Sequence, residues 1–152
     1  MRQQLVTIPA TVPAQEQRWL DLEHAATVEV TSEDKDFPID SSLSIEHKQG
    51  WRAAGPGAQT IRLLFDQPQE IRRISLLFEE DEVKRTQEFV LRSGGPFREI
   101  VRQQWNFSAP ASTREIEEYS VELSDIGLLE LTIVPDISGG AARASLKSLR
   151  LV

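Results

Sequence analysis

Two tryptophans, Trp51 and Trp105, could form a platform for a sugar. An indole face packs against the apolar face of a pyranose ring, and its N–H can bond a hydroxyl. Trp105 shares one face of an expected strand with Val101 and Phe107, which predicts a core tryptophan. Trp51 precedes a Gly-Pro-Gly turn without clear alternation, so a sugar platform and a core position fit it about equally well.

Arg52, Arg85 and Arg114 lie beside segments that lack the regular alternation of apolar and polar residues. A guanidinium can donate paired hydrogen bonds to a carboxylate, a phosphate or neighbouring sugar hydroxyls. Ion pairs with adjacent glutamates are the commoner role of such arginines on a surface. The predicted ligand-binding site consists of Trp51, Arg52, Arg85 and Arg114.

The other residues that could bind a metal or take part in catalysis do not form the pattern of a known reaction. Asp34, Asp36 and Asp40 could offer oxygen ligands to calcium, but their spacing is not that of an EF-hand, and a solvated loop is the simpler interpretation. The chain has no cysteine, no serine in a Gly-x-Ser-x-Gly context and no glycine-rich phosphate loop. His24 falls on the apolar face of an expected strand, where we expect it to be buried and hydrogen-bonded. We therefore predict no catalytic residue, no metal site and no cofactor.

The elements that must position these residues are strands. Alternating apolar residues predict about eight short strands, and no segment has the apolar stripe of a helix. We expect an all-β jelly-roll β-sandwich of antiparallel strands. The expected strands or hairpins are 20–31, 59–78 as a central hairpin with Pro68 in its turn, 87–107 as a second hairpin, 119–123, 129–133 and 145–152.

Counting strand directions places the connections at two ends of the sandwich. Long loops at 32–58, 79–86, 108–114 and 135–142 should share one end. Tight turns at 67–70, 94–97 and 124–127 should lie at the other end with both termini. Since binding sites usually form on loops held by a rigid frame, we expect the site at the long-loop end.

Length and charge restrict the class of protein. The 152 residues suit one domain, expected at 19–152, after a tail or edge strand at 1–18. A net charge of −7 repels phosphate backbones, so nucleic acid is not an expected partner. No apolar run is long enough to insert into a membrane or to act as a secretory signal, which favours a cytoplasmic protein.

The segment from Leu22 to Leu151 resembles the galactose-binding-like jelly roll of discoidin, or coagulation factor 5/8 type C, domains and related carbohydrate-binding modules. The resemblance rests on VTSED after the first strand, on QTIRLLFDQPQEIRRISLLF, on RTQEFVLRSGGPFREIVRQQWNFS and on the closing LELTIVPDISGGAARASLKSLRL. It implies a binding module for sugars, lipid head groups or proteins. This chain has Lys147 and Ser148 where calcium-binding members often offer a glutamate.

Two functions follow as hypotheses. The first is a non-catalytic module that binds carbohydrate through the long loops. The alternative is an intracellular protein-interaction domain, similar to the N-terminal domain of the single-strand-break repair scaffold. A concave polar cleft beside Trp51 would favour sugar, whereas a large exposed apolar patch on a sheet face would favour a protein partner.

Overall fold

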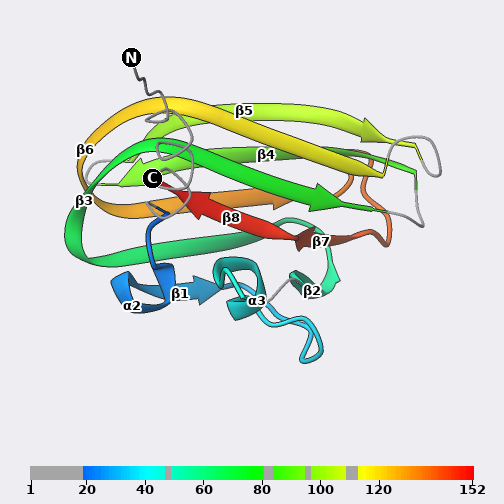
Figure 1. Ribbon diagram of the computed structural model, residues 1–152. Helices are drawn as coiled ribbons and strands as arrows, with labels where there is room; N and C mark the ends of the chain where they lie inside the picture. The colour runs from blue at the N-terminus through cyan, green and yellow to red at the C-terminus, as the bar shows by residue number, and fades with distance from the viewer. Residues whose placement is uncertain (1–18, 47–48, 81–83, 95–96, 109–112) are drawn as a thin grey trace, which may run out of the picture.

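The chain folds into a two-layered β-sandwich, as shown by a computed structural model that describes residues 19–46, 49–80, 84–94, 97–108 and 113–152 (Figure 1). The described strands are β1 (Ala26–Val30), β2 (Trp51–Pro56), β3 (Gln59–Glu79), β4 (Arg85–Gly94), β5 (Arg98–Phe107), β6 (Arg114–Val134), β7 (Arg143–Leu146) and β8 (Ser148–Leu151). Two single-turn helices, α2 (Leu22–Ala25) and α3 (Asp40–Leu43), cover one side. The predicted all-β jelly roll is confirmed.

Strands β3 and β6 are each 21 residues long and connect the two layers. They pair antiparallel from Gln59 opposite Ile133 to Glu79 opposite Arg114, with register shifts between Leu64 and Arg73. These irregularities let both strands bend over together at the left of Figure 1. The first half of β3 therefore lies in one layer and its second half in the other.

This arrangement corrects the predicted central hairpin. The two apolar runs within 59–78 form the two halves of one strand, and residues 67–70 form its bend rather than a tight turn. Each half of β3 pairs with β6 instead of pairing with the other half. The predicted turn at 124–127 is likewise the bend of β6, where Asp125 has a φ of 60°. The predicted hairpin at 87–107 is confirmed as β4 and β5.

The first layer has the strand order β1-β3-β6-β4-β5. In the second layer, β8 pairs with the second half of β3, which pairs with the first half of β6. The β2–β7 ribbon adjoins this layer, and the N–H of Lys147, between β7 and β8, bonds the Leu77 carbonyl at 2.9 Å.

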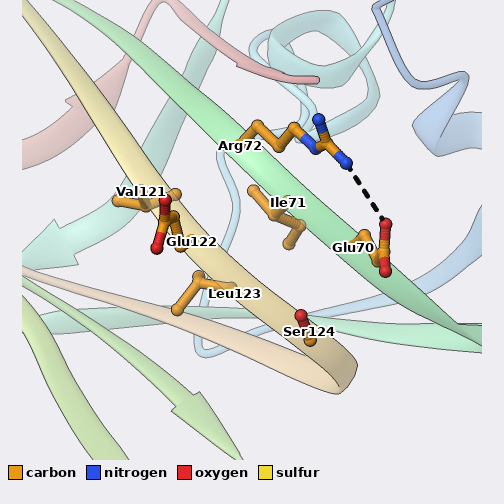
Figure 2. A pocket seen from close by; sticks show the side chains of 7 residues that line it. All are labelled: Glu70, Ile71, Arg72, Val121, Glu122, Leu123 and Ser124. Atoms are coloured by element: carbon orange, nitrogen blue, oxygen red, sulfur yellow. Dashed lines mark ion pairs between the residues drawn. The ribbon is translucent and has the colours of Figure 1, made fainter.

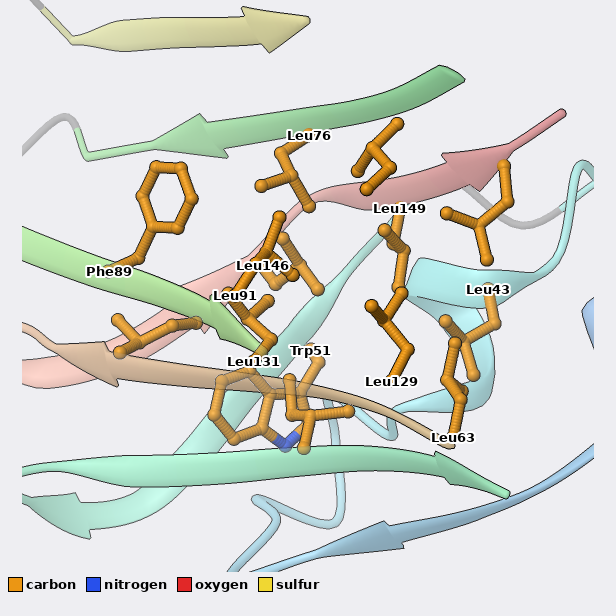
Figure 3. Close-up of a cluster of buried hydrophobic side chains, with 14 of the residues drawn as sticks. Leu43, Trp51, Leu63, Leu76, Phe89, Leu91, Leu129, Leu131, Leu146 and Leu149 are labelled. Carbon is orange, nitrogen blue, oxygen red and sulfur yellow. The ribbon is translucent and has the colours of Figure 1, made fainter. Parts of the chain in front are cut away.

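The core lies between the two layers, where inward-facing leucine, isoleucine and aromatic side chains are almost fully buried (Figure 3). Burying each such side chain stabilises the fold by about 1.5–3 kcal/mol. Trp105 packs against this core, with its ring centroid 5.1 Å from that of Phe78 and 5.6 Å from that of Phe89. Its predicted core role is confirmed.

The strand pairings place the segments that flank the expected long loops at one end, whereas two of the three tight turns expected at the other end are the bends of β3 and β6. The expected N-terminal tail and residues 95–96 of the third turn lie outside the described residues. The pairings place Val30, Gln59, Arg85, Phe107 and Val134 at one end, called here the long-loop end. The other end, called the bend end, holds the bends of β3 and β6. The C-terminus lies there as well, since the Val152 N–H bonds the Arg73 carbonyl at 3.0 Å.

The start of the domain differs from the expected strand over 20–31. Residues 22–25 form α2, and only Ala26–Val30 form a strand. The side chain of His24 is 82% exposed and bonds Asp21 at 2.7 Å, so the prediction of a buried histidine is wrong. The helical turn breaks the alternation that would have placed His24 inside. The expected edge strand within 1–18 lies outside the described residues.

None of the helices in the described ranges is both long and apolar enough to cross a membrane. The segment 114–118 belongs to β6.

Candidate ligand-binding site

A polar hollow of about 180 Å³, called here the Arg52 hollow, lies on the β2–β7 ribbon near the end of β3. Its lining combines two partly buried cations, a carboxylate, an amide and a hydroxyl with aromatic and aliphatic groups. The lining residues are Phe37, Gln49, Trp51, Arg52, Glu79, Ser145, Leu146 and Lys147.

The alternation of the ribbon positions this lining. Trp51 pairs with Leu146, and Arg52 pairs with Ser145. Trp51 and Leu146 are 1% and 0% exposed, while the other pair has intermediate burial. Because successive side chains of a strand point to opposite faces, burying Trp51 directs Arg52 to the outer face.

The backbone of the preceding loop fixes Phe37 beside Arg52. The Arg52 N–H bonds the Phe37 carbonyl at 3.1 Å, and the Arg52 carbonyl accepts from the Asp34 N–H at 2.8 Å. These bonds extend the ribbon by a short loop segment. A residue distant in sequence is thereby brought next to the arginine.

Trp51 contributes to the floor of the Arg52 hollow and does not form an open platform. Its ring lies within the core, among leucines from both layers (Figure 3), and its Nε1–H donates to the Ser32 carbonyl at 3.0 Å. Of the two interpretations left open by the sequence, the structure therefore supports the core position. No indole face is available to stack on a sugar in this arrangement.

Arg52 has an unusual environment for an arginine. Its guanidinium carbon lies 5.3 Å from the centroid of the Phe37 ring, a cation–π contact. Its Nε is buried without a hydrogen-bond partner, and its side chain makes no ion pair with any described residue. Buried polar atoms are nearly always bonded, so this one unsatisfied donor marks a place where an added acceptor would be favourable.

The neighbouring charges are already paired with one another. Lys147 Nζ lies 3.5 Å from Glu79 Oε1, and Arg143 lies 3.3 Å from Asp34 Oδ2. A backbone bond from Asp36, then the bond and charge of Arg143 and finally the charge of Arg52 lower the pKa of Asp34 against an opposing effect of burial. Arg52 itself makes no ion pair with a described residue, although its charge contributes to lowering the pKa of Asp34.

Arg85 has the opposite character. Its side chain is 1% exposed, and its guanidinium donates to Gln87 Oε1 at 3.0 Å and to the Pro135 carbonyl at 2.8 Å. It also pairs with Glu80 at 2.8 Å and lies over the Phe107 ring. Burial lowers the pKa of Arg85, which Glu80 opposes. Its bonds tie β4 to two loops, which indicates a structural role.

A second hollow of about 380 Å³ lies at the long-loop end beside Arg85. It is lined by Lys84, Arg85, Thr86, Asn106, Phe107, Ser108, Asp136 and Ser138. Thr86 and Asn106 bond each other at 2.5 Å, and Asp136 accepts the Ser138 N–H at 3.0 Å. Several of its polar groups are thus engaged within the protein.

The structure brings together part of the predicted site. Trp51 and Arg52 line one hollow, and Arg85 is close enough that the charge of Arg52 contributes to lowering its pKa. Arg114 is exposed at the start of β6, opposite Glu79, and lines neither hollow. As ligand-binding residues, all four remain predictions.

Sequence reasoning did not select Phe37, Glu79 or Lys147 for the site. Phe37 stood out as an aromatic residue within a charged loop, and Lys147 as a basic residue in the closing segment. Either signal pointed to a residue, but neither indicated which distant residue it would meet.

The aspartates of the first loop are used locally. Asp34 Oδ1 accepts the Asp36 N–H at 2.9 Å, while Asp40 begins α3. Across the ranges that the structure describes, no group of three or more histidines, aspartates or glutamates is placed to hold a metal ion.

A further hollow of about 410 Å³ lies at the bend end (Figure 2). It is lined by Glu70, Ile71, Arg72, Val121, Glu122, Leu123 and Ser124. Arg72 pairs with Glu70 at 3.7 Å, and their side chains are 78% and 68% exposed. This arginine is thus both solvated and paired.

The fold is shared with carbohydrate-binding modules. The family 32 module of NanJ from C. perfringens, in complex with galactose, is similar with a TM-score of 0.64 and 11% identity over 88% of this chain and 96% of the module. The family 32 module of AlyQ, in complex with 4,5-unsaturated mannuronic acid, has a TM-score of 0.61 and 14% identity over 84% of this chain and 95% of the module. Module CpGH89CBM32-5 of Clostridium perfringens, in complex with GalNAc-β-1,3-galactose, has a TM-score of 0.61 and 17% identity over 88% of this chain and 98% of the module.

At these identities the likeness establishes the fold. No protein-family model matches the sequence, and neither does any curated protein. The chain therefore has the jelly-roll sandwich fold of these modules, with an Arg52 hollow on its β2–β7 ribbon.

Proposed function

We propose that this protein is a non-catalytic carbohydrate-binding module and that the Arg52 hollow is its sugar site. The observation that carries the proposal is the guanidinium of Arg52, which makes no ion pair with a described residue and lies beside an aromatic ring in a polar hollow. Sugars present closely spaced oxygens that accept from a guanidinium.

The rest of the Arg52 hollow offers suitable partners for hydroxyls. Gln49 has an amide that can donate and accept, Ser145 has a hydroxyl, and Glu79 can accept. Phe37 supplies an apolar surface, although Arg52 covers part of its ring. A few convergent polar groups beside an apolar surface are typical of small-molecule sites.

The similar modules support the same proposal, because three of them are described in complex with sugars. The polar hollow beside Trp51 is also the feature that distinguishes a sugar site from a protein-interaction face. The large exposed hydrophobic residues within the described ranges lie on separate segments of the chain: Ile45, Phe97, Ile116 and Ile137.

An NMR titration of the labelled protein with mono- and oligosaccharides tests the proposal. Binding should shift the backbone amides of Arg52, Ser145 and Lys147 and the Arg52 Nε–H signal. The amides around Arg72 at the bend end provide an internal control and should not move. The absence of shifts with every sugar of the panel would contradict the proposal and favour the protein-interaction alternative. Shifts confined to the bend end would show that sugar binds at a different site and would contradict the Arg52 hollow as the sugar site.

A further inference from the structure

The charges around the Arg52 hollow indicate whether its ligand is a neutral or an acidic sugar. This inference rests on the function proposed above. Glu79 and Asp34 each lie near the site, but each is paired with a base other than Arg52. Glu80, the next acid along the chain, lies 2.8 Å from Arg85. These acids are each paired with another base, and among the described residues no carboxylate lies within ion-pair distance of Arg52.

A guanidinium carries a full positive charge. The Nε–H of Arg52 is buried without an acceptor among the described residues, which is unfavourable for a polar group. A neutral hydroxyl would supply an acceptor but would leave the charge unmatched. A carboxylate would supply two acceptor oxygens and the opposite charge, and its planar fork matches the geometry of the guanidinium.

We propose that the Arg52 hollow binds an acidic sugar, a uronate, whose carboxylate pairs with Arg52. The sugar ring then lies toward Phe37, and its hydroxyls meet Ser145 and Gln49. Lys147 adds a second positive group at the hollow, although Glu79 partly neutralises it. The overall charge of −7 disfavours anions at long range, so the selection must come from this local arrangement.

The test compares matched sugars by calorimetry and NMR. The probes are tetramers of 1,4-linked galacturonate and mannuronate, with their carboxyl-reduced forms as neutral counterparts. We expect the uronates to bind at least about tenfold more tightly than the reduced sugars, because a charged hydrogen-bonded pair contributes more than a neutral one. Raising sodium chloride from about 0.05 to about 0.5 M should weaken uronate binding, because salt screens the charge pair.

Three variants test whether Arg52 causes the preference for uronate. Arg52→Gln should lose the preference for uronate, with affinity falling about tenfold or more. Arg52→Lys should lose part of it, because lysine keeps the charge without the fork. Arg72→Gln removes the same charge at the bend end and should leave binding unchanged.

The results separate this inference from the function on which it rests. If reduced sugars bind at the Arg52 hollow as tightly as uronates do, or if Arg52→Gln affects both equally, the sugar site stands and the acidic preference is overturned. If neither kind of sugar shifts the NMR signals of the residues that line the hollow, both proposals fail.

Discussion

The Arg52 hollow and the bend-end hollow each contain an arginine, but the two arginines have different surroundings. Arg72 is 78% exposed and lies 3.7 Å from Glu70, so water and a carboxylate satisfy its charge. Arg52 is partly buried, stacks on Phe37 and makes no ion pair among the described residues. The larger hollow is therefore not the better candidate, because unsatisfied donors rather than volume indicate a site for a ligand.

The largest expected effect tests whether the floor of the Arg52 hollow is core. Trp51→Ala should lower the free energy of unfolding by about 3–5 kcal/mol, as is typical of truncating a buried aromatic residue. Chemical denaturation measures the change. Trp51→Phe, which keeps most of the volume but loses the bond to Ser32, should cost less. A small loss for Trp51→Ala would show that the ring is not part of the core.

The next effect separates Arg52 from its buried neighbour Arg85. Arg85→Gln should lower the free energy of unfolding by about 3 kcal/mol, because it removes the ion pair between this buried guanidinium and Glu80. Arg52→Gln should change it by less than about 1 kcal/mol, the scale of one cation–π contact. Thermal and denaturant unfolding of both variants provide the measurement.

Equal losses in the two variants would mean that Arg52 also stabilises the fold. The proposal of a ligand site would then lose the observation on which it depends. A large loss for Arg85→Gln alone would confirm that the two arginines have different roles.

The fold could be predicted from sequence because alternation is a local property. The inward residues of β3 and β6 were correctly expected, and the strand count placed the long loops at one end. The bends were interpreted as turns because Pro68 and the segment around Asp125 contain turn-forming residues. Whether a chain turns back or bends into the other layer depends on its pairing with a distant strand, which local patterns do not contain.

The site could likewise be predicted only in part, because it depends on contacts between residues that are distant in sequence. Arg52 could be selected because it follows a long loop and adjoins a tryptophan. Its partners come from four separate segments, around positions 37, 49, 79 and 145–147. Their proximity follows from the β2–β7 register and from the backbone bonds of Phe37, neither of which a single sequence reveals.

A smaller effect is expected at the bend end. Asp125 has a φ of 60°, a conformation that aspartate tolerates and β-branched residues do not. Asp125→Val should lower the free energy of unfolding by about 1–2 kcal/mol, whereas Asp125→Asn should be nearly neutral. Denaturant unfolding would distinguish them. Similar stability of the two variants would show that the bend of β6 does not require this conformation.

The smallest effect is expected at the opposite end of β6, where Glu115 lies opposite Phe78 and Glu117 opposite Leu76. Because paired residues of adjacent strands point to the same face, these carboxylates turn toward the interior side. A hydrogen bond with Glu117, partial burial and the charge of Glu117 raise the pKa of Glu115 to about 7. The Tyr119 hydroxyl also donates to Glu117.

The sign of the resulting pH dependence follows from this shift. The folded pKa of about 7 lies above the ordinary value of 4.5, so protonated Glu115 contributes stability below about pH 4.5 that is lost as the pH rises through about 7. Glu115→Gln removes this titration. The variant should therefore lose less thermal stability than the parent between about pH 5 and about pH 8. Parallel pH profiles would mean that Glu115 ionises freely and that the inward-facing pair does not share a proton.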